Sequence, residues 1–288
     1  DGRGSVSGDS FLEIGNVSFS YDKKKQALRD FSLSVAVPEA VADRPLPAEA
    51  GHAGGGIFLS IIGPNGCGKT TLMKLIAGIL EPNAGQLRLL GQEITRKTDP
   101  SKILAYVPQT LTLGFSLSVL DFVLLGISSG AGLSGKVSRK AVEKARQALR
   151  LLRAEEYEDR DMLRLSGGER QKIIVSKALA QDTPVLLLDE PMTHLDLAGQ
   201  IEILELLKKL SVDGGKKIIA IMHDINLAAR YSDYTLMMKD GRLFAAGKTR
   251  EVVTEESIAR CFSVTVERVG DFFVPVGAGW PLAGNSIH

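Results

Sequence analysis

The chain has 288 residues, of which 44% are hydrophobic and 24% are charged, values that are ordinary for a globular protein. The formal net charge of +1 gives no reason to expect nucleic acid as a partner. No apolar run reaches the ~18–20 residues that span a bilayer, and the two cysteines, Cys67 and Cys261, form no CxxC pair that would support a disulfide framework or a zinc site.

The first sixty residues predict strands interrupted by a loop. Residues 1–10 are rich in Gly and Ser, and we expect a flexible leader there. Apolar and polar residues alternate over 11–21 and again over 28–37, which predicts two strands. Residues 38–56 contain Ala, Pro and Gly without apolar periodicity, so we expect an inserted loop. The short apolar run 57–62 predicts a buried strand.

Helices and strands are expected to alternate along the rest of the chain. In chain order we expect helices over 70–80, 138–153 and 169–180, a strand over 185–188, a helix over 201–210 and a strand over 217–222. Ser138 is available to cap the second of these helices, whose apolar residues share one face. This alternation predicts an α/β fold with a mostly parallel sheet that is covered on both faces.

Residues 63–70 match the phosphate-loop pattern GxxxxGK[ST] between a predicted strand and a predicted helix. The glycines let backbone N–H groups turn toward phosphate oxygens, and the helix N-terminus adds partial positive charge. Lys69 can reach the terminal phosphates, and the hydroxyl of Thr70 can coordinate Mg²⁺, with that of Thr71 as an additional candidate. A chance glycine-rich turn is the alternative. The predicted nucleotide-binding residues here are Gly63, Pro64, Asn65, Gly66, Cys67, Gly68, Lys69, Thr70 and Thr71.

Cys67 lies in this motif, beside Lys69 and among the expected N–H groups. Positive surroundings of this kind can lower the pKa of a thiol and make it reactive. The alternative is that Cys67 is simply a small residue that fits the loop. The sequence does not decide between the two.

Two acidic residues follow the predicted strand 185–188. Such a strand delivers carboxylates to the C-terminal edge of a parallel sheet, where ligands bind. Asp189 is placed to hold Mg²⁺ through water, and Glu190 to orient or deprotonate an attacking water. The alternative is a strand end that needs acids for solubility.

A third motif, Leu-Ser-Gly-Gly-Glu at 165–169, opens the predicted helix 169–180. Its small residues free backbone N–H groups at a helix start, which makes a second anion site. A plain turn with Ser166 as helix cap is the alternative.

These motifs together resemble those of the ABC ATPases. The resemblance implies a P-loop NTPase fold with a mostly parallel core sheet, an N-terminal antiparallel β subdomain and an inserted helical subdomain over about 112–165. It places the ATPase domain at 11–275 and a tail at 276–288. It also implies a homodimer, in which the signature of one subunit closes over ATP held by the phosphate loop of the other. The signature residues acting in trans would be Ser166, Gly167, Gly168 and Glu169.

Four further residues match the family residue by residue. Tyr21 resembles the aromatic that stacks on adenine, although a core tyrosine at a strand end is the alternative. Gln109 resembles the glutamine that touches Mg²⁺ and responds to the membrane partner. Asp196 resembles the residue that crosses the dimer interface. His223 resembles the switch histidine that contacts the γ-phosphate, and with Glu190 and Lys69 it completes the expected catalytic set.

Stretches 119–126, 223–231 and 239–242, with Gly247, resemble importers for iron–siderophore, haem and cobalamin. The resemblance implies ATP and Mg²⁺ as cofactors and integral membrane permease subunits as partners. It implies a cytoplasmic location on the inner face of the cell membrane, and the low cysteine content fits a reducing cytosol. The alternatives are the ATPase of another ABC importer class and a non-transport ABC ATPase. A regulatory module is disfavoured because it need not keep Glu190.

Overall fold

The computed structural model describes residues 10–22, 26–36, 55–95, 97–127 and 137–278. The leader, the loop and the tail expected from the sequence lie almost entirely outside these ranges. The chain divides into two compact units. The first comprises Asp1–Ala36, Leu59–Thr95 and Ile221–His288, and the second comprises Val37–Phe58 and Arg96–Ala220. Within the described ranges, no helix has both the length and the apolar character needed to cross a membrane.

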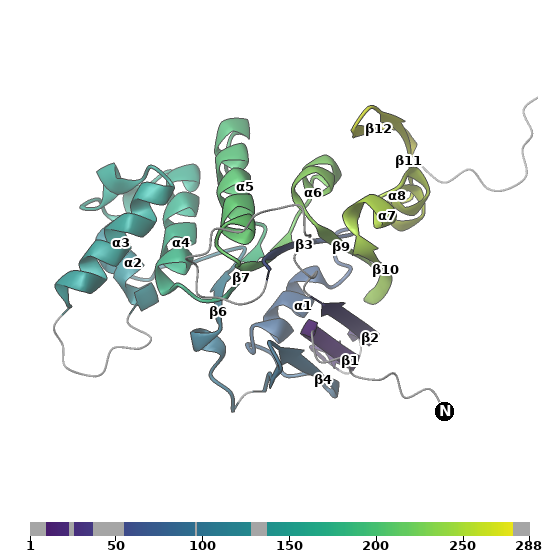
Figure 1. The fold of residues 1–288 in the computed structure, drawn as a ribbon, viewed down its shortest axis with the longest axis horizontal. Helices are drawn as coiled ribbons and strands as arrows, with labels where there is room; N and C mark the ends of the chain where they lie inside the picture. Colours follow the sequence, from purple (N-terminus) through teal and green to yellow (C-terminus); the bar gives the residue numbers. More distant parts are fainter. Residues whose placement is uncertain (1–9, 23–25, 37–54, 96, 128–136, 279–288) are drawn as a thin grey trace, which may run out of the picture. The chain divides into compact units, whose positions relative to one another are not determined.

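The first unit holds the N-terminal strands, the helix after the phosphate loop and the C-terminal elements (Figure 1). Its elements are β1 (Ser10–Ser20), β2 (Gln26–Ala36), most of β3 (Ile57–Ile62), α1 (Lys69–Ile76), β4 (Ala84–Leu89), β5 (Gln92–Glu93), α6 (Ile225–Tyr231), β9 (Tyr234–Lys239), β10 (Arg242–Lys248), α7 (Thr249–Val252), α8 (Glu255–Phe262), β11 (Val264–Val269) and β12 (Phe272–Ala278).

The second unit holds the longer helices. Its elements are a 3₁₀ turn (Pro100–Lys102), β6 (Leu104–Val107), α2 (Val119–Ile127), α3 (Arg139–Leu151), two further 3₁₀ turns (Glu155–Tyr157 and Met162–Arg164), α4 (Gly167–Gln181), β7 (Val185–Asp189), α5 (Leu197–Val212) and most of β8 (Lys217–Ile221). Helices α2, α3 and α4 pack against one another and form one helical group in Figure 1.

The strands form both kinds of sheet expected from the sequence. In the first unit, β2-β1-β4-β5 are antiparallel, β3 pairs in parallel with β9, and β11 pairs with β12 as a hairpin. In the second unit, β6 pairs in parallel with β7, which neighbours β8. Parallel strands with helices and a separate antiparallel sheet confirm the predicted α/β, P-loop NTPase class.

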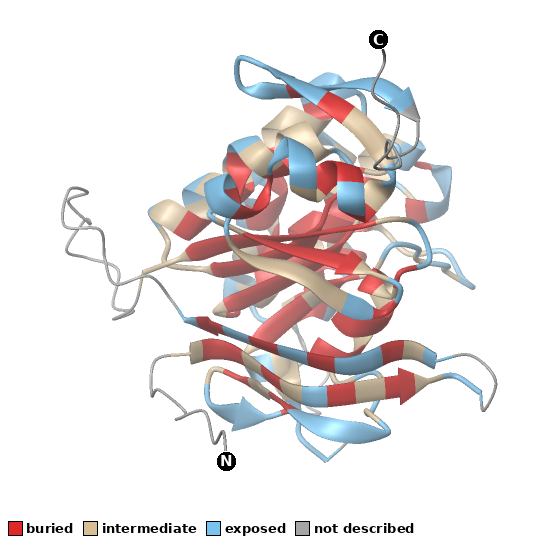
Figure 2. Ribbon diagram, turned by 90° about the vertical axis from the view of Figure 1, so that its right-hand side faces the viewer, coloured by how far each residue is buried: buried red, intermediate tan, exposed pale blue. Residues whose placement is uncertain are grey.

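Burial explains why the two kinds of strand read differently in the sequence. Every residue of β3, β7 and β8 is buried (Figure 2), and each strand is apolar except for one residue, without alternation of apolar and polar positions. In β2, by contrast, buried Phe31, Leu33 and Val35 alternate with exposed residues, because one face of that sheet is solvated.

The observed ends of three helices depend on their capping residues, and two of these ends differ from the prediction. Ser138 caps α3 as expected and accepts a hydrogen bond from the Ala141 N–H at 3.1 Å. Helix α1 ends at Ile76, four residues early, because Gly78 turns into the left-handed region (φ 70°). Helix α5 starts at Leu197, four residues before the predicted start, because Asp196 caps it.

Substitutions at two glycines allow the cost of backbone strain to be measured separately from the cost of a steric clash. Gly85 (φ 85°) and Gly91 (φ 76°) share the left-handed region, but only a Cβ on Gly85 would clash, at 2.4 Å from the Gly15 carbonyl oxygen. We expect Gly91→Ala to lower the free energy of unfolding by about 1 kcal/mol, and Gly85→Ala by about 1–3 kcal/mol more. Urea unfolding of both variants measures the difference. Equal losses would mean that β1 and β4 move apart without cost.

Candidate functional site

The phosphate loop links β3 to α1 in a conformation that requires glycine. Gly63, Gly66 and Gly68 have φ values of 154°, 76° and 101°. A Cβ on Gly63 would lie 2.2 Å from the Met238 carbonyl oxygen, and one on Gly68 would lie 2.7 Å from that of Ala27. Since real Cβ atoms do not approach oxygens so closely, any side chain at either position would displace the loop.

The start of α1 is built for an anion. Its cap residue, Gly68, provides no side-chain acceptor, and the first turn contains no acidic residue. The N–H groups of that turn therefore keep their partial positive charge, which is the property of phosphate-binding helix starts.

Lys69 is held inside the loop. Its Nζ donates hydrogen bonds to the carbonyl oxygens of Gly63 at 2.8 Å and Pro64 at 3.0 Å, and the residue is only 6% exposed. Carbonyl acceptors satisfy the buried ammonium without neutralising it. The loop therefore carries a full positive charge next to the uncapped helix start.

Cys67 is buried in the same loop, and a Cβ on Gly63 would lie 2.9 Å from its Sγ. Burial raises the pKa of the Cys67 thiol above its ordinary value, and the charge of Lys69 offsets this only in part. A raised pKa disfavours the first of the two alternatives, a reactive thiol. The alternative, a small residue that fits the loop, agrees with the packing.

Tyr21 follows β1 directly and lies beside α1. Its hydroxyl is 3.2 Å from Oγ1 of Thr71, and its ring meets that of Phe19 edge-to-face with centroids 5.0 Å apart. The residue is 61% exposed, so the alternative of a core tyrosine is wrong. An aromatic ring fixed at its edge and open on one side suits stacking on a base.

The acidic residues lie in the second unit, at the end of β7. Asp189 is fully buried, and its Oδ2 accepts a hydrogen bond from the Tyr106 hydroxyl at 3.3 Å. Glu190 adopts φ 54°, a strained conformation for a residue with a side chain. Gln109 Nε2 donates to Glu190 Oε2 at 2.8 Å. The structure thus brings together Gln109 and Glu190, which are far apart in the sequence.

The signature motif forms a capping box at the start of α4. Ser166 Oγ accepts a hydrogen bond from the Glu169 N–H at 3.3 Å, while Glu169 Oε2 accepts one from the Ser166 N–H at 2.8 Å. Hydrogen bonding with Ser166, through its side chain and then its backbone, lowers the pKa of Glu169. Arg160 adds an ion pair with Glu169 at 3.7 Å. The plain cap expected as the alternative is present, but it leaves Gly167 exposed.

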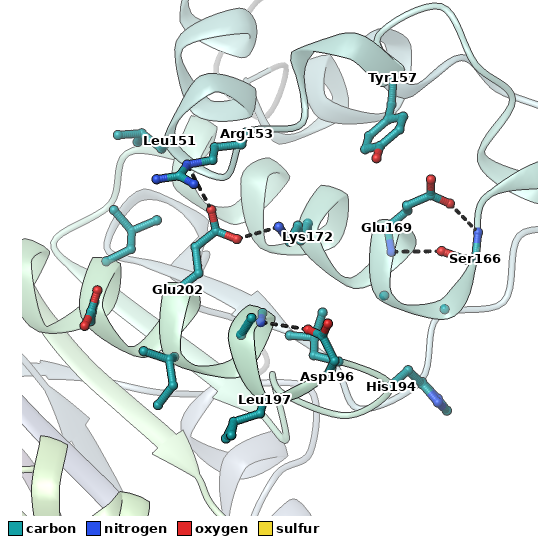
Figure 3. A pocket seen from close by; sticks show the side chains of 18 of the residues that line it. Leu151, Arg153, Tyr157, Ser166, Glu169, Lys172, His194, Asp196, Leu197 and Glu202 are labelled. Atoms are coloured by element: carbon teal, nitrogen blue, oxygen red, sulfur yellow. Dashed lines mark hydrogen bonds and ion pairs between the residues drawn. The ribbon is translucent and has the colours of Figure 1, made fainter.

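The signature and the loop before α5 line one cavity of about 1500 Å³ in the second unit (Figure 3). A Cβ on Gly167 would lie 3.0 Å from the Cβ of His194, so the two segments approach closely. Asp196 also lines the cavity, and its Oδ1 accepts a hydrogen bond from the Gly199 N–H at 2.8 Å. Asp196 therefore caps α5, a structural task that the sequence reading did not assign to it.

The predicted site residues fall in both units. Tyr21, the phosphate loop and His223 belong to the first unit, where His223 is exposed just after β8. Gln109, the two acids, the signature and Asp196 belong to the second. The sequence reading missed the contact of Tyr106 with Asp189, because an aromatic residue in a strand looks like any core residue.

The exposed ring of Tyr21 gives a direct test. If it stacks on a base, Tyr21→Ala should weaken ATP binding about tenfold or more, since base–aromatic stacking contributes ~1–3 kcal/mol in single-strand binding proteins. Tyr21→Phe keeps the ring, loses only the contact with Thr71, and should bind ATP within about threefold of wild type. Fluorescent-ATP titration measures both. Equal affinity in all three proteins would remove Tyr21 from the site.

Comparison with known proteins agrees with these motifs. A family model described as ABC transporter matches residues 53–193. The iron(3+)-hydroxamate import ATP-binding protein FhuC of Bacillus subtilis (strain 168) is 38% identical over 221 residues, which are 75% of this chain and 81% of FhuC.

Solved structures share the fold. One is an inward-facing conformation of a transporter described as metal-chelate type, with a TM-score of 0.74, 27% identity, and coverage of 93% of this chain and 98% of the other. Another is the dimeric cassette MJ0796 in a post-hydrolysis state with ADP and Pi, with a TM-score of 0.70, 25% identity and coverage of 83% and 99%. The chain accordingly belongs to the ABC transporter family, as an ATP-binding cassette ATPase.

Proposed function

We propose that the chain hydrolyses ATP to power an importer of metal chelates of the iron–siderophore, haem or cobalamin type. The observation that carries this proposal is the 38% identity to an iron(3+)-hydroxamate import ATP-binding protein over three quarters of the chain. The similarity to a metal-chelate type transporter over 93% of the chain supports it. Integral membrane permease subunits are the proposed partners, and the inner face of the cell membrane is the proposed location.

The proposed nucleotide site uses backbone and side-chain groups in separate roles. Lys69 and the N–H groups of the loop hold the phosphates, and the ring of Tyr21 stacks on adenine. The hydroxyl of Thr70, the amide oxygen of Gln109 and, through water, the carboxylate of Asp189 are oxygen ligands of the kind that Mg²⁺ prefers. Bound Mg²⁺ would neutralise charge on the phosphates. His223 is proposed to contact the γ-phosphate.

Glu190 is proposed to orient and deprotonate the attacking water. The hydrogen bond from Gln109 Nε2 to Oε2 of its carboxylate supports this role, because it restrains the side chain of the proposed base. The main-chain oxygen of Glu190 accepts hydrogen bonds from the Thr193 N–H and hydroxyl at 3.3 and 3.1 Å, which support the strained turn. Restraint of the backbone and of the carboxylate supports the proposed role, because a general base must be held within reach of the proton that it takes.

Replacing Glu190 tests its role. Glu190→Gln keeps the shape and removes the base, so ATP hydrolysis should fall about 10²–10⁴-fold while ATP binding stays within about twofold. Steady-state phosphate release and nucleotide titration measure the two quantities. Hydrolysis at the wild-type rate would contradict the assignment.

The same variant tests the importer. A strain lacking the gene should lose uptake of one chelate among labelled ferric hydroxamate, haem and cobalamin. The wild-type gene should restore uptake, and the Glu190→Gln gene should not. Unchanged uptake of all three chelates in the deleted strain would contradict the import proposal, while leaving the ATPase assignment intact.

We further propose that two copies form a dimer with shared sites, each built from the phosphate loop of one copy and the signature of the other. The exposed Gly167 and Asp196 and the cavity beside them support this arrangement, because they leave an anion-binding helix start open to a partner. The dimeric cassette that shares this fold also supports it.

Mixing experiments test the shared site. In the double variant Lys69→Ala/Ser166→Arg, every site of a mixed dimer with wild type has one damaged half. ATPase activity should therefore fall as the square of the wild-type fraction, once subunit exchange is confirmed. If each chain held a complete site, the fall would be linear. The control variant is Ser138→Arg, which removes the cap of α3, a residue that is also exposed. A mixture of this variant with wild type should stay active, because only a helix cap is lost.

A further inference from the structure

A second hollow lies in the first unit, among elements to which the reaction assigns no role. It has a volume of about 730 Å³ and is bordered by α6, α7 and the β11–β12 hairpin. We call it the arginine cleft. Its main lining residues are Asn226, Arg230, Arg250, Arg268, Phe272 and Phe273. No residue of the phosphate loop contributes to it.

The cleft gathers positive charge from three elements: Arg230 in α6, Arg250 in α7 and Arg268 in β11. Asp271 is the one carboxylate among its lining residues, and it lies 3.9 Å from Arg268. Within the described part of the chain, neither Arg230 nor Arg250 forms an ion pair. Arg230 and Arg250 thus bring to the cleft two positive charges that have no carboxylate partner among the described residues, and an anion bound there would offset them.

The walls of the cleft are fixed by hydrogen bonds. The Asn226 side chain both donates to the Phe273 carbonyl at 3.2 Å and accepts from the Phe273 N–H at 2.7 Å, which ties α6 to β12. Glu255 accepts from the Arg268 N–H at 2.5 Å, which ties α8 to β11. The Arg268 guanidinium is held in turn within the hairpin, where its Nε donates to the Gly270 carbonyl at 3.0 Å. A binding site with preformed walls loses little entropy when it takes a ligand.

We propose that the arginine cleft binds a small organic polyanion that carries two or more carboxylate or phosphate groups. Guanidinium groups bind such groups through paired, charge-assisted hydrogen bonds. Phe272, which is 54% exposed, offers an apolar surface for the carbon skeleton. The volume falls within the ~300–1,000 Å³ that is usual for small-molecule sites. The site is independent of the transported substrate.

Titration of the full chain tests the proposal. All proteins carry Lys69→Ala, which removes the lysine of the phosphate loop as a competing anion site. The probes are citrate, a tricarboxylate, and inorganic pyrophosphate. We expect at least one probe to bind with one site per chain, and Arg230→Gln/Arg250→Gln to weaken that binding at least about tenfold.

The matched control is Arg29→Gln/Arg242→Gln, which removes the same charge from exposed positions of the same unit outside the cleft. It should bind the probe within about twofold of the parent. Absence of binding of both probes at millimolar concentration would overturn the proposal. Equal weakening by the two arginine pairs would also overturn it, because it would show attraction to net charge rather than a site.

Hydrogen exchange gives a readout that does not depend on affinity alone. A ligand that bridges α6, α7 and the hairpin should slow amide exchange over 264–278 in the parent, and not in Arg230→Gln/Arg250→Gln. Slowing to the same extent in both proteins would place the probe elsewhere and overturn the assignment.

Discussion

The constraint on which the site depends is the close approach of backbone to backbone around the phosphate loop. Gly63 and Gly68 lie against carbonyl oxygens of Met238 and Ala27, where no side chain fits. The Gly241 N–H donates to the Cys67 carbonyl at 3.1 Å, and the Gly241 carbonyl accepts from the Arg29 N–H at 2.8 Å. Two segments that are distant in sequence, 27–29 and 238–241, thus pack around one loop. This scaffold fixes the backbone of the loop, as a preorganised binding site requires.

The starts of α1 and α4 differ in how their N–H groups are capped, and hence in the positive charge that they expose. The start of α1 has no capping side chain, whereas α4 has a complete capping box. The first is suited to accept phosphate within its own chain. The second uses Glu169 to satisfy one N–H group and keeps Gly167 at the surface. The two helix starts therefore differ in the way that the proposed shared site requires: one is enclosed by its own chain and one is open to a partner.

The sequence predicted those parts of the site that depend on local backbone chemistry. The phosphate-loop turn, the acidic end of β7 and the Ser166 helix cap each need particular residue types at fixed positions, so the sequence pattern indicates them. The sequence did not show that Cys67 would be buried or that Tyr106 would reach Asp189, because both depend on packing between distant segments. The sequence analysis did not predict the β9–β10 hairpin, although Asp240-Gly241 is a turn signal.

Asp196 has two roles, a structural one and a proposed one at the dimer interface, and a single substitution would affect both. It faces the cavity beside the signature, and it also caps α5. Loss of a cap costs about 1 kcal/mol, so Asp196→Ala would lower the stability of α5 whether or not any partner exists. Asn and Ser also cap helices well but carry no charge. In a mutational scan, the contrast between these two residues and Ala isolates the helix, and the contrast between Asp and Asn isolates the charge that a partner would meet.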